Sequence, residues 1–232
     1  MKMKKLHVMT LAALIMLGLS GCEKAKVVNV ASADVFIKAI KNDQGTPVYA
    51  AIHSVFSYNT MTSVAAKSPD GTSIALINYM NTGNSFYNDP PVTAYSTTLP
   101  PVGAYTYTVK FNDGEELPYS NTLSPTALLP ANITSLVKSA KGDSVYISFD
   151  AIAGVDFYQI KVTKGDTQVF YANNLSDQST PKKTSLRYPF LLSSLTSSIS
   201  GTYTFEITGL LYESTAYDYL QAISTATKDI AL

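Results

Sequence analysis

The stretch AYTYTVKFNDGEELPY, Ala104 to Tyr119, decides the fold of this chain. Aromatic and branched residues occupy every second position from Tyr105 to Phe111, and threonine or lysine lies between them. This alternation predicts a β-strand with one buried face. The Asn112-Asp113-Gly114 turn then predicts a hairpin that returns through Leu117 and Tyr119. We therefore expect a chain built from antiparallel strands.

The composition also favours an all-β fold, because Thr, Ser, Tyr, Val and Ile are abundant and no stretch after residue 21 keeps a helical apolar period. Three of the 17 basic residues precede residue 22, which leaves 14 basic against 17 acidic residues in the rest of the chain. Nucleic-acid binding needs a basic surface, so we expect no nucleic-acid partner.

Two parts of the chain repeat one plan. LPPVGAYTYTV from Leu99 matches LYESTAYDYLQ from Leu211, and a Gly-x-x-Val-Tyr stretch lies upstream of each. Self-similarity at about 100 residues indicates tandem domains rather than a short-period solenoid. In β-sandwiches a tyrosine at the start of a strand can clamp the preceding corner through its hydroxyl. We predict this role for Tyr105 and Tyr217, with Leu99 and Leu211 filling the core beneath the two corners.

The second copy, from Pro130 to Leu232, resembles a fibronectin type III domain. SVYISFDAIAGVDFYQIKV, residues 144–162, is similar to strands B and C of that family, and FEITGLLYESTAY, residues 205–217, to the passage from strand E to strand F. Phe149 stands where the family usually has tryptophan, and Glu213 where it prefers proline. The resemblance implies an all-β chain with two tandem immunoglobulin/fibronectin III-like β-sandwiches.

The N-terminus has a basic start at residues 2–5, an apolar run over residues 6–19, and then Ser20 and Gly21. This layout is typical of a secretory signal peptide, and the run is shorter than the roughly 20 residues that span a bilayer. LSGC, ending at Cys22, resembles the bacterial lipobox. The resemblance implies that Cys22 carries a diacylglycerol and, after cleavage, an N-acyl chain such as palmitate; an ordinary secretory signal is the alternative. Glu23, in place of aspartate, favours the outer membrane by the same resemblance.

These features divide the chain into five parts, with Pro125 and Pro130 marking a short linker that predicts two sandwiches in a semi-rigid line. The expected parts are a lipoprotein signal peptide (1–21), a lipidated tether (22–32), an immunoglobulin-like β-sandwich (33–124), a linker (125–131) and a fibronectin III-like β-sandwich (132–232).

Residues that carry chemistry are few. One cysteine excludes an internal disulfide, and one histidine outside the signal, His53, cannot build a zinc site with an acylated thiol. No calcium loop or phosphate-binding glycine loop occurs, so we expect no metal and no cofactor. The alternation around His53 predicts that it lies on a solvated strand face with Tyr49 and Ala51, without a catalytic role.

The stretch NTGNSFYNDPPVTAY, residues 81–95, is the first candidate binding region. Its glycine and prolines predict a loop, and aromatic side chains in a loop must be buried or used. Tyrosines beside amides and carboxylates can stack on a sugar or anchor a protein partner. The candidate residues are Phe86, Tyr87, Asn88, Asp89 and Tyr95, and the alternative is that the aromatic pair caps one end of the sandwich.

The second candidate is SLRYPFLLSSL, residues 185–195, in which Arg187, Tyr188 and Phe190 suit a protein interface. The alternative is an edge strand that packs Phe190, Leu191 and Leu192 on the core.

Together these features predict a lipid-anchored binding or scaffolding protein of the cell envelope, in the outer membrane and without catalytic activity. It would present sandwich loops to an unknown protein or glycan and touch the membrane through its N-terminal lipid. The alternatives are an envelope hydrolase with acidic residues converging from distant strands, or a purely structural spacer.

Overall fold

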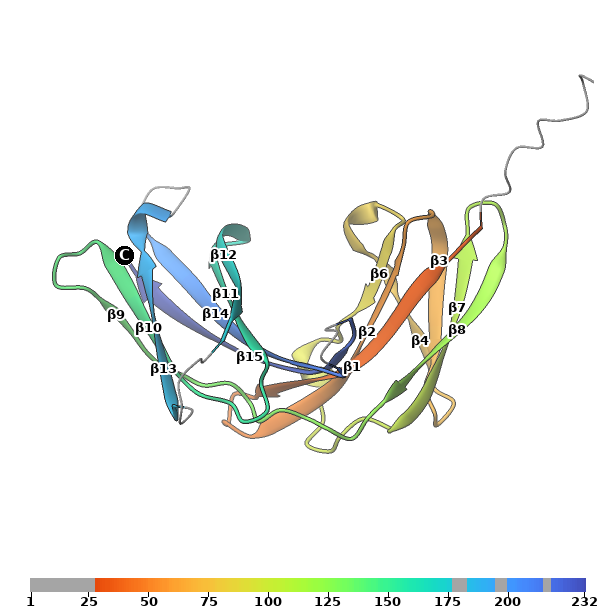
Figure 1. Ribbon diagram of the computed structural model, residues 1–232, viewed down its shortest axis with the longest axis horizontal. Helices are drawn as coiled ribbons and strands as arrows, with labels where there is room; N and C mark the ends of the chain where they lie inside the picture. Colours follow the sequence, from red (N-terminus) through yellow and green to blue (C-terminus); the bar gives the residue numbers. More distant parts are fainter. Residues whose placement is uncertain (1–27, 177–182, 195–199, 215–217) are drawn as a thin grey trace, which may run out of the picture. The chain divides into compact units, whose positions relative to one another are not determined.

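The computed structural model describes residues 28–176, 183–194, 200–214 and 218–232 (Figure 1). Its first eight strands are β1 (Ala31–Lys41), β2 (Pro47–Ser57), β3 (Met61–Lys67), β4 (Ser73–Ala75), β5 (Ile77–Asn78), β6 (Ser85–Asn88), β7 (Gly103–Phe111) and β8 (Glu116–Leu123). Strands β1, β2, β6 and β5 are neighbours in that order, and β4, β3, β7 and β8 form a second sheet. Two short 3-10 helices, η1 (Tyr79–Asn81) and η2 (Val92–Ala94), flank β6. This is the strand order of an immunoglobulin-like sandwich.

The remaining strands form a second sandwich. They are β9 (Ile133–Lys138), β10 (Ser144–Asp150), β11 (Phe157–Lys164), β12 (Thr167–Leu175), β13 (Ser185–Leu191), β14 (Thr202–Tyr212) and β15 (Leu220–Ala231), with the 3-10 helix η3 (Leu192–Ser194) after β13. The neighbours are β13-β10-β9 on one side and β12-β11-β14-β15 on the other. This order is that of a fibronectin III-like sandwich, so the predicted fold class is confirmed.

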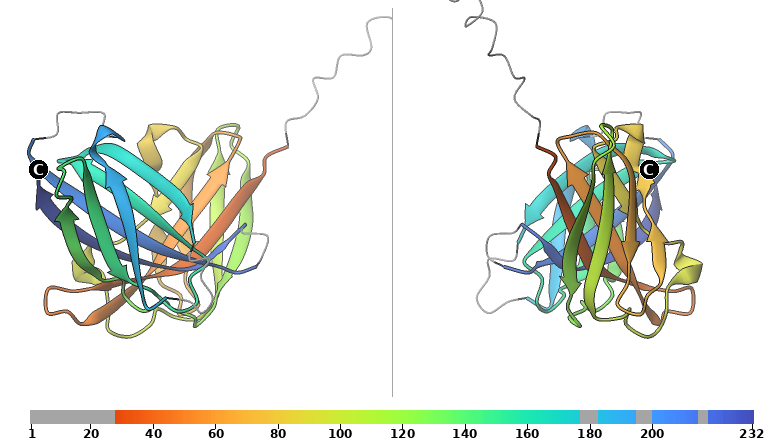
Figure 2. Two further views of the ribbon diagram at one scale, coloured as in Figure 1. Left: turned by 60° about the vertical axis from the view of Figure 1, so that its left-hand side comes forward. Right: turned by 90° about the vertical axis from the view of Figure 1, so that its right-hand side faces the viewer.

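The two sandwiches share one sheet. Strand β1 pairs in parallel with β15, and Ile37, Lys38 and Ala39 lie opposite Ala222, Ile223 and Ser224. The result is a continuous eight-stranded sheet in the order β12-β11-β14-β15-β1-β2-β6-β5, in which β1 and β15 run side by side (Figures 1 and 2). A semi-rigid line of two domains would be joined by the proline-bearing segment alone. Here the paired strands β1 and β15 form a second connection between the sandwiches. A division at residues 125–131 into separately folding domains stays a prediction.

Both faces of this shared sheet are covered near its centre. Along β1, Val35 and Ile37 point into the main core, whereas Phe36 points to the opposite face. There Phe36 joins a second, smaller apolar cluster with buried residues from β2, β14 and β15. Near-continuous burial explains why β1 reads Val-Phe-Ile without alternating polar residues.

The hairpin of β7 and β8 forms as its sequence predicts. Tyr105, Tyr107, Val109 and Phe111 are buried and the residues between them are exposed. The strands pair from Gly103 opposite Leu123 to Lys110 opposite Glu116. The Tyr105 hydroxyl donates to the Pro101 carbonyl oxygen at 2.9 Å, which confirms the predicted tyrosine corner.

The prediction that Leu99 fills the core below this corner is wrong, because its side chain is 39% exposed. The two copies also do not align as their sequences suggest: Leu99 precedes β7, whereas Leu211 lies within β14. Strand β14 occupies the position of strand F, so residues 205–217 do not run from strand E to strand F, and β13 is strand E. Strands B and C of the resemblance are confirmed as β10 and β11.

Cys22 and Tyr217 lie outside the described residues, so lipidation of the first and a corner role of the second stay predictions. A different tyrosine clamps a turn of the second sandwich. The Ile152 backbone N–H donates to the Tyr158 hydroxyl at 2.7 Å, between β10 and β11.

His53 is not on a solvated face. Its side chain is 1% exposed and lies inside the first sandwich against the rings of Tyr105 and Tyr107. Nδ1 is 3.0 Å from the Tyr107 hydroxyl, which itself donates to the Asp34 carbonyl oxygen at 3.1 Å. The expectation failed because β2 is buried on both faces, so its alternation does not identify a solvent side.

Candidate functional site

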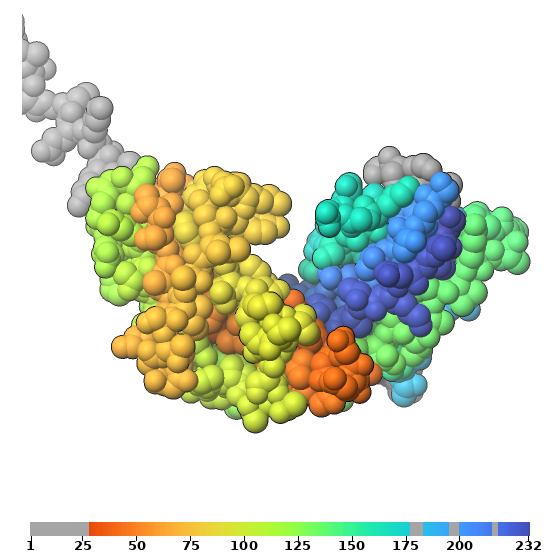
Figure 3. All heavy atoms as spheres, turned by 180° about the vertical axis from the view of Figure 1, so that it is seen from behind, coloured from red at the N-terminus to blue at the C-terminus, as the bar shows by residue number. Residues whose placement is uncertain are grey.

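A groove of about 560 Å³ opens where both sandwiches contribute to one surface. It is lined by the end of β1, the segment after β6, the start of β9 and outward-facing threonines of β15. In Figure 3 these segments adjoin one another: the orange end of β1, the yellow-green segment 89–95, green residues near 132 and blue β15. We call it the Tyr95 groove; its polar lining residues are Lys38, Lys41, Asp43, Asp89, Tyr95, Asn132, Thr225 and Thr227.

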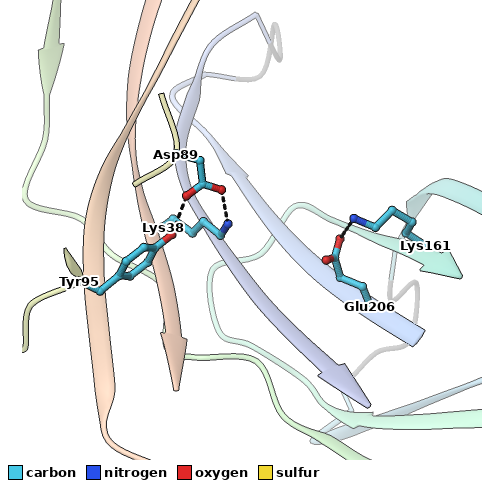
Figure 4. Close-up of polar contacts among 5 residues, drawn as sticks. All are labelled: Lys38, Asp89, Tyr95, Lys161 and Glu206. Carbon is cyan, nitrogen blue, oxygen red and sulfur yellow. Dashed lines mark hydrogen bonds and ion pairs between the residues drawn. The ribbon is translucent and has the colours of Figure 1, made fainter. Parts of the chain in front are cut away.

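Three side chains fix one wall of the Tyr95 groove (Figure 4). Lys38 Nζ lies 2.6 Å from Asp89 Oδ2, and the Tyr95 hydroxyl donates to Asp89 Oδ1 at 2.8 Å. Both oxygens of the carboxylate are therefore engaged within the protein. Asp89 therefore positions the Lys38 ammonium group and the Tyr95 ring.

The backbone around Tyr95 is held at both ends. Asp89 directly follows β6, which pairs with β2 from His53 to Phe56. Pro90 and Pro91 then restrict the backbone and lead into η2. Beyond Tyr95, Ser96 pairs with Tyr49 of β2 through bonds of 2.7 and 3.0 Å. The segment is therefore pinned to β2, which keeps the Tyr95 ring in place before any ligand arrives.

The hydroxyl groups of Tyr95, on this wall, and of Tyr87, in the cluster beside the groove, stay protonated. The pKa of Tyr95 is raised above its usual value, chiefly by burial and then by its bond to the Asp89 carboxylate. Burial, followed by the charge of Asp89, also raises the pKa of Tyr87. Both tyrosines therefore act as neutral hydrogen-bonding and stacking groups at physiological pH.

The floor beside the groove is apolar and aromatic. It is the smaller cluster of the shared sheet, in which Tyr87 and Tyr95 pack with Phe157, Tyr212 and Leu220 against buried residues of β1, β2, β14 and β15. Further along the same face, Lys161 and Glu206 form an ion pair across β11 and β14 at 2.7 Å (Figure 4). The surface thus combines rings with fixed charges from both sandwiches.

The structure separates the residues of the first candidate region. Tyr87, Asp89 and Tyr95 face this surface. Phe86 points the opposite way, is 3% exposed and packs in the main core, so its ring is not available to a partner. Asn88 donates to the Ala75 carbonyl oxygen at 3.3 Å and holds the chain beside β4. The expected loop is wrong at residues 85–88, which form β6.

The second candidate region is an edge strand, β13, rather than one surface patch. Arg187 lies over the Tyr146 ring at 3.9 Å, and Tyr188 stacks on Phe149 with centroids 6.0 Å apart. Phe190 is 4% exposed and packs in the core. The edge-strand alternative is therefore confirmed for Phe190 and also for Leu192, whereas Leu191 is 55% exposed.

Sequence reasoning missed the parts of the groove that come from distant strands. Lys38, Asn132, Thr225 and Thr227 belong to β1, the segment before β9 and β15. The one local signal was Lys38, a charged residue inside the otherwise apolar run from Val35 to Ile40.

Within the described ranges, no group of three or more His, Cys, Asp or Glu side chains is placed to hold a metal ion. Over the same part of the chain, no helix has the length and apolar character needed to cross a membrane.

No protein-family model matches the chain, and no curated protein matches it. Among solved structures, it is similar to a tetra-tandem repeat from the extending region of a large adhesion protein, with 12% identity over 87% of this chain and 50% of that chain and a TM-score of 0.31. It is also similar to a two-domain fibronectin type III segment of chicken tenascin (11% identity, 88% and 100% covered, TM-score 0.29) and to dimeric latent PorU of Porphyromonas gingivalis (10% identity, 91% and 21% covered, TM-score 0.32). The chain thus spans half of the adhesion-protein structure, and about a fifth of PorU. With similarities this low, the fold class rests on the strand order of the molecule itself.

Proposed function

We propose that this protein is a non-catalytic binding protein of the bacterial cell envelope, lipid-anchored through Cys22 in the outer membrane, that holds a glycan in the Tyr95 groove. The observation that carries the binding role is the locked arrangement of Lys38, Asp89 and Tyr95 on the wall of a polar groove. The anchor and its location rest on the LSGC sequence and on Glu23.

The size and lining of the groove favour a saccharide over a flat protein partner. Its volume of about 560 Å³ lies in the range of small-ligand sites, roughly 300–1,000 Å³. A tyrosine ring offers a face for stacking, and fixed lysine, amide and hydroxyl groups can bond to sugar hydroxyls. A standard protein interface needs about 800 Å² on each partner and an apolar centre, which suits this polar recess less well.

The geometry also speaks against hydrolysis in this groove. Glycoside hydrolysis uses two carboxyl groups on opposite sides of the scissile bond, one of them able to donate a proton. Of the groove's two acids, Asp89 has both oxygens engaged by Lys38 and Tyr95. The remaining acid, Asp43, lies in the exposed β1–β2 turn.

The proposal is tested by screening the lipidated protein, in detergent, against a saccharide array. Tyr95→Ala should weaken binding to any saccharide that the wild type retains by about 30-fold, the effect of losing roughly 2 kcal/mol at an anchor residue. Tyr58→Ala is the matched control, since this ring is 92% exposed and does not line the groove. Equal saccharide binding by Tyr95→Ala and Tyr58→Ala would refute the proposal that the saccharide binds in the Tyr95 groove. If the protein binds no saccharide but captures a protein, and Tyr95→Ala abolishes that capture, the proposed glycan ligand is wrong and the groove binds a protein.

A structural spacer is the second candidate, favoured by the pairing of β1 with β15 that makes one sheet of two sandwiches. A protein that binds no ligand, and whose groove variants leave cells unaffected, would support it.

A further inference from the structure

Two turns form a single tip at the end of the first sandwich where β1 begins. Ala31, the first residue of β1, lies opposite Ser57, the last residue of β2. The Asn84 side-chain amide donates to the carbonyl oxygens of Ser57 and Tyr58 at 3.0 and 3.2 Å. The Met61 N–H donates to the Gly83 carbonyl oxygen at 2.7 Å. These bonds join the β2–β3 turn to the segment around η1, and Figure 1 shows both at one end of the sandwich.

Large apolar side chains are exposed at this tip. Tyr58 is 92% exposed, Met80 74%, Tyr79 49% and Phe56 45%. We call these four residues the apolar tip. The rings of Phe56 and Tyr58 meet edge to face with centroids 5.1 Å apart, so part of the tip is preassembled. Gathered exposed apolar side chains of this kind mark an interaction surface.

The backbone under Met80 also favours an external partner. Met80 and the following Asn81 have φ of 53° and 55°, the left-handed region that costs energy in residues other than glycine. Met80 is not among the core residues of the sandwich. The strain therefore holds a flexible apolar side chain outward, where only a molecule outside the sandwich can cover it.

The charge pattern around the apolar tip selects its partner. Residues 44–66 and 71–88 contain no Asp, Glu, Lys or Arg, so the two segments that form the tip carry no charged side chain. The β7–β8 hairpin adjoins the tip, because the Asn112 N–H donates to the Thr60 carbonyl oxygen at 3.0 Å. This hairpin carries one lysine, Lys110, and three acids, Asp113, Glu115 and Glu116. Tyrosine in an uncharged setting is favoured at the headgroup level of a membrane. The excess of three acids over one lysine on the adjoining hairpin is compatible with a zwitterionic surface and opposes an anionic one.

The length of the tether places such a surface within reach. Eight residues lie between Cys22 and Ala31, so nine Cα–Cα steps join them, a span of at most about 32 Å when fully extended. A lipid on Cys22 would keep the start of β1 within that distance of the bilayer. At the resulting high local concentration, even a weak interfacial contact is occupied.

We propose that the apolar tip rests on the lipid bilayer, with Tyr58 and Met80 at the headgroup level of a zwitterionic leaflet. This inference depends on the proposed lipid anchoring and adds a second, non-covalent membrane contact. The Tyr95 groove lies toward the other end of β1, beside Lys38 and Lys41, so the contact leaves the groove open to solvent.

The absence of tryptophan from the sequence gives a direct test. Tyr58→Trp introduces one indole at the tip, and Tyr171→Trp introduces one at a 46% exposed position on β12, in the other sandwich. The lipidated variants are reconstituted in phosphatidylcholine–phosphatidylethanolamine vesicles with brominated acyl chains. Indole emission of Tyr58→Trp should be quenched and shifted to shorter wavelength, and that of Tyr171→Trp should match the protein in detergent.

Flotation of the same vesicles separates this inference from the anchor on which it depends. Wild-type protein should float with vesicles, and Cys22→Ser should remain in the dense fraction; wild-type protein that stays behind refutes the anchoring. Protein that floats while Tyr58→Trp and Tyr171→Trp emit alike refutes the membrane contact alone. The indole emission of Tyr58→Trp could instead shift only as the protein density in the vesicles rises, without quenching by bromine. That result would show that the apolar tip contacts a second copy of the chain, and it would refute the membrane contact.

Discussion

A half-buried carboxyl group, Asp34, and a buried imidazole, His53, lie on neighbouring strands and should change the stability of the fold in opposite directions in acid. Burial raises the pKa of Asp34 to about 6, a bond from the Leu220 N–H lowers it in part, and the charge of Glu213 raises it further. Burial lowers the pKa of His53 to about 4. Asp34 lies on β1 opposite Ser54, one position from His53 on β2. We therefore expect both to titrate between pH 4 and 6.5, with effects of opposite sign on stability.

The sign follows from which state holds the proton. As pH falls from 6 to 4, folded protein takes up a proton on Asp34 that the unfolded chain does not yet bind, so the free energy of unfolding rises. As pH falls from 6.5 to 4, the unfolded chain protonates His53 while the folded protein does not, so the free energy of unfolding falls. With pKa values of about 6 for Asp34 and about 4 for His53, each group contributes about 3 kcal/mol, and the two contributions nearly cancel in the wild type.

Single substitutions should reveal each contribution in urea unfolding curves followed by circular dichroism between pH 4 and 7. Asp34→Asn keeps an acceptor for the Leu220 N–H, and relative to wild type it should lose about 3 kcal/mol as pH falls from 7 to 4. His53→Gln should gain a similar amount relative to wild type over the same range. Because each variant is compared with wild type, the titration of other groups drops out.

Parallel profiles for Asp34→Asn and wild type would show that this carboxyl group titrates normally, and the argument from burial would be wrong. A difference that slopes the opposite way would mean that the folded state stabilises the charged carboxylate instead.

Three further substitutions test the packing. Tyr105→Phe should cost about 1 kcal/mol of unfolding free energy in urea, since it removes the corner hydrogen bond, and an unchanged midpoint would argue against the clamp. Phe86→Ala should cost about 3–5 kcal/mol and Tyr87→Ala clearly less by thermal melting, because only the first ring lies in the main core; equal losses would contradict this division. Gly209→Ala should cost about 1–3 kcal/mol, as its Cβ would lie 2.9 Å from Val155 Cγ2, and a variant as stable as wild type would show that β14 relaxes freely.

Local pattern was sufficient where one strand face is buried and the other solvated. The alternation from Tyr105 to Phe111 and the turn at Gly114 predict β7, its register and its partner, because the information lies within a few residues. The same reasoning failed for His53, whose strand is covered on both faces. It also failed for Phe86, because the glycine and prolines on either side of it led to the prediction of a loop where the chain forms β6.

The joint between the sandwiches could not be predicted from local pattern. Strands β1 and β15 are separated by nearly the whole chain. Because they pair in parallel, no hairpin turn joins them, and so no turn sequence indicates the pairing. Tyr87, Asp89 and Tyr95 were recognised as candidates, since they lie close together in the sequence. Lys38 and the threonines of β15 join them only because that pairing brings β15 beside β1.

The parallel joint has a mechanical consequence. Traction applied where β1 begins, and resisted by the second sandwich, is shared between the covalent segment 124–132 and the bonds between β1 and β15. These bonds run sideways between the strands, so the pull slides one strand along the other and loads the paired residues together, rather than peeling them apart one by one. Under the proposed lipid anchoring, a ligand pulling on the second sandwich would load this joint in shear, the direction in which paired strands resist separation best.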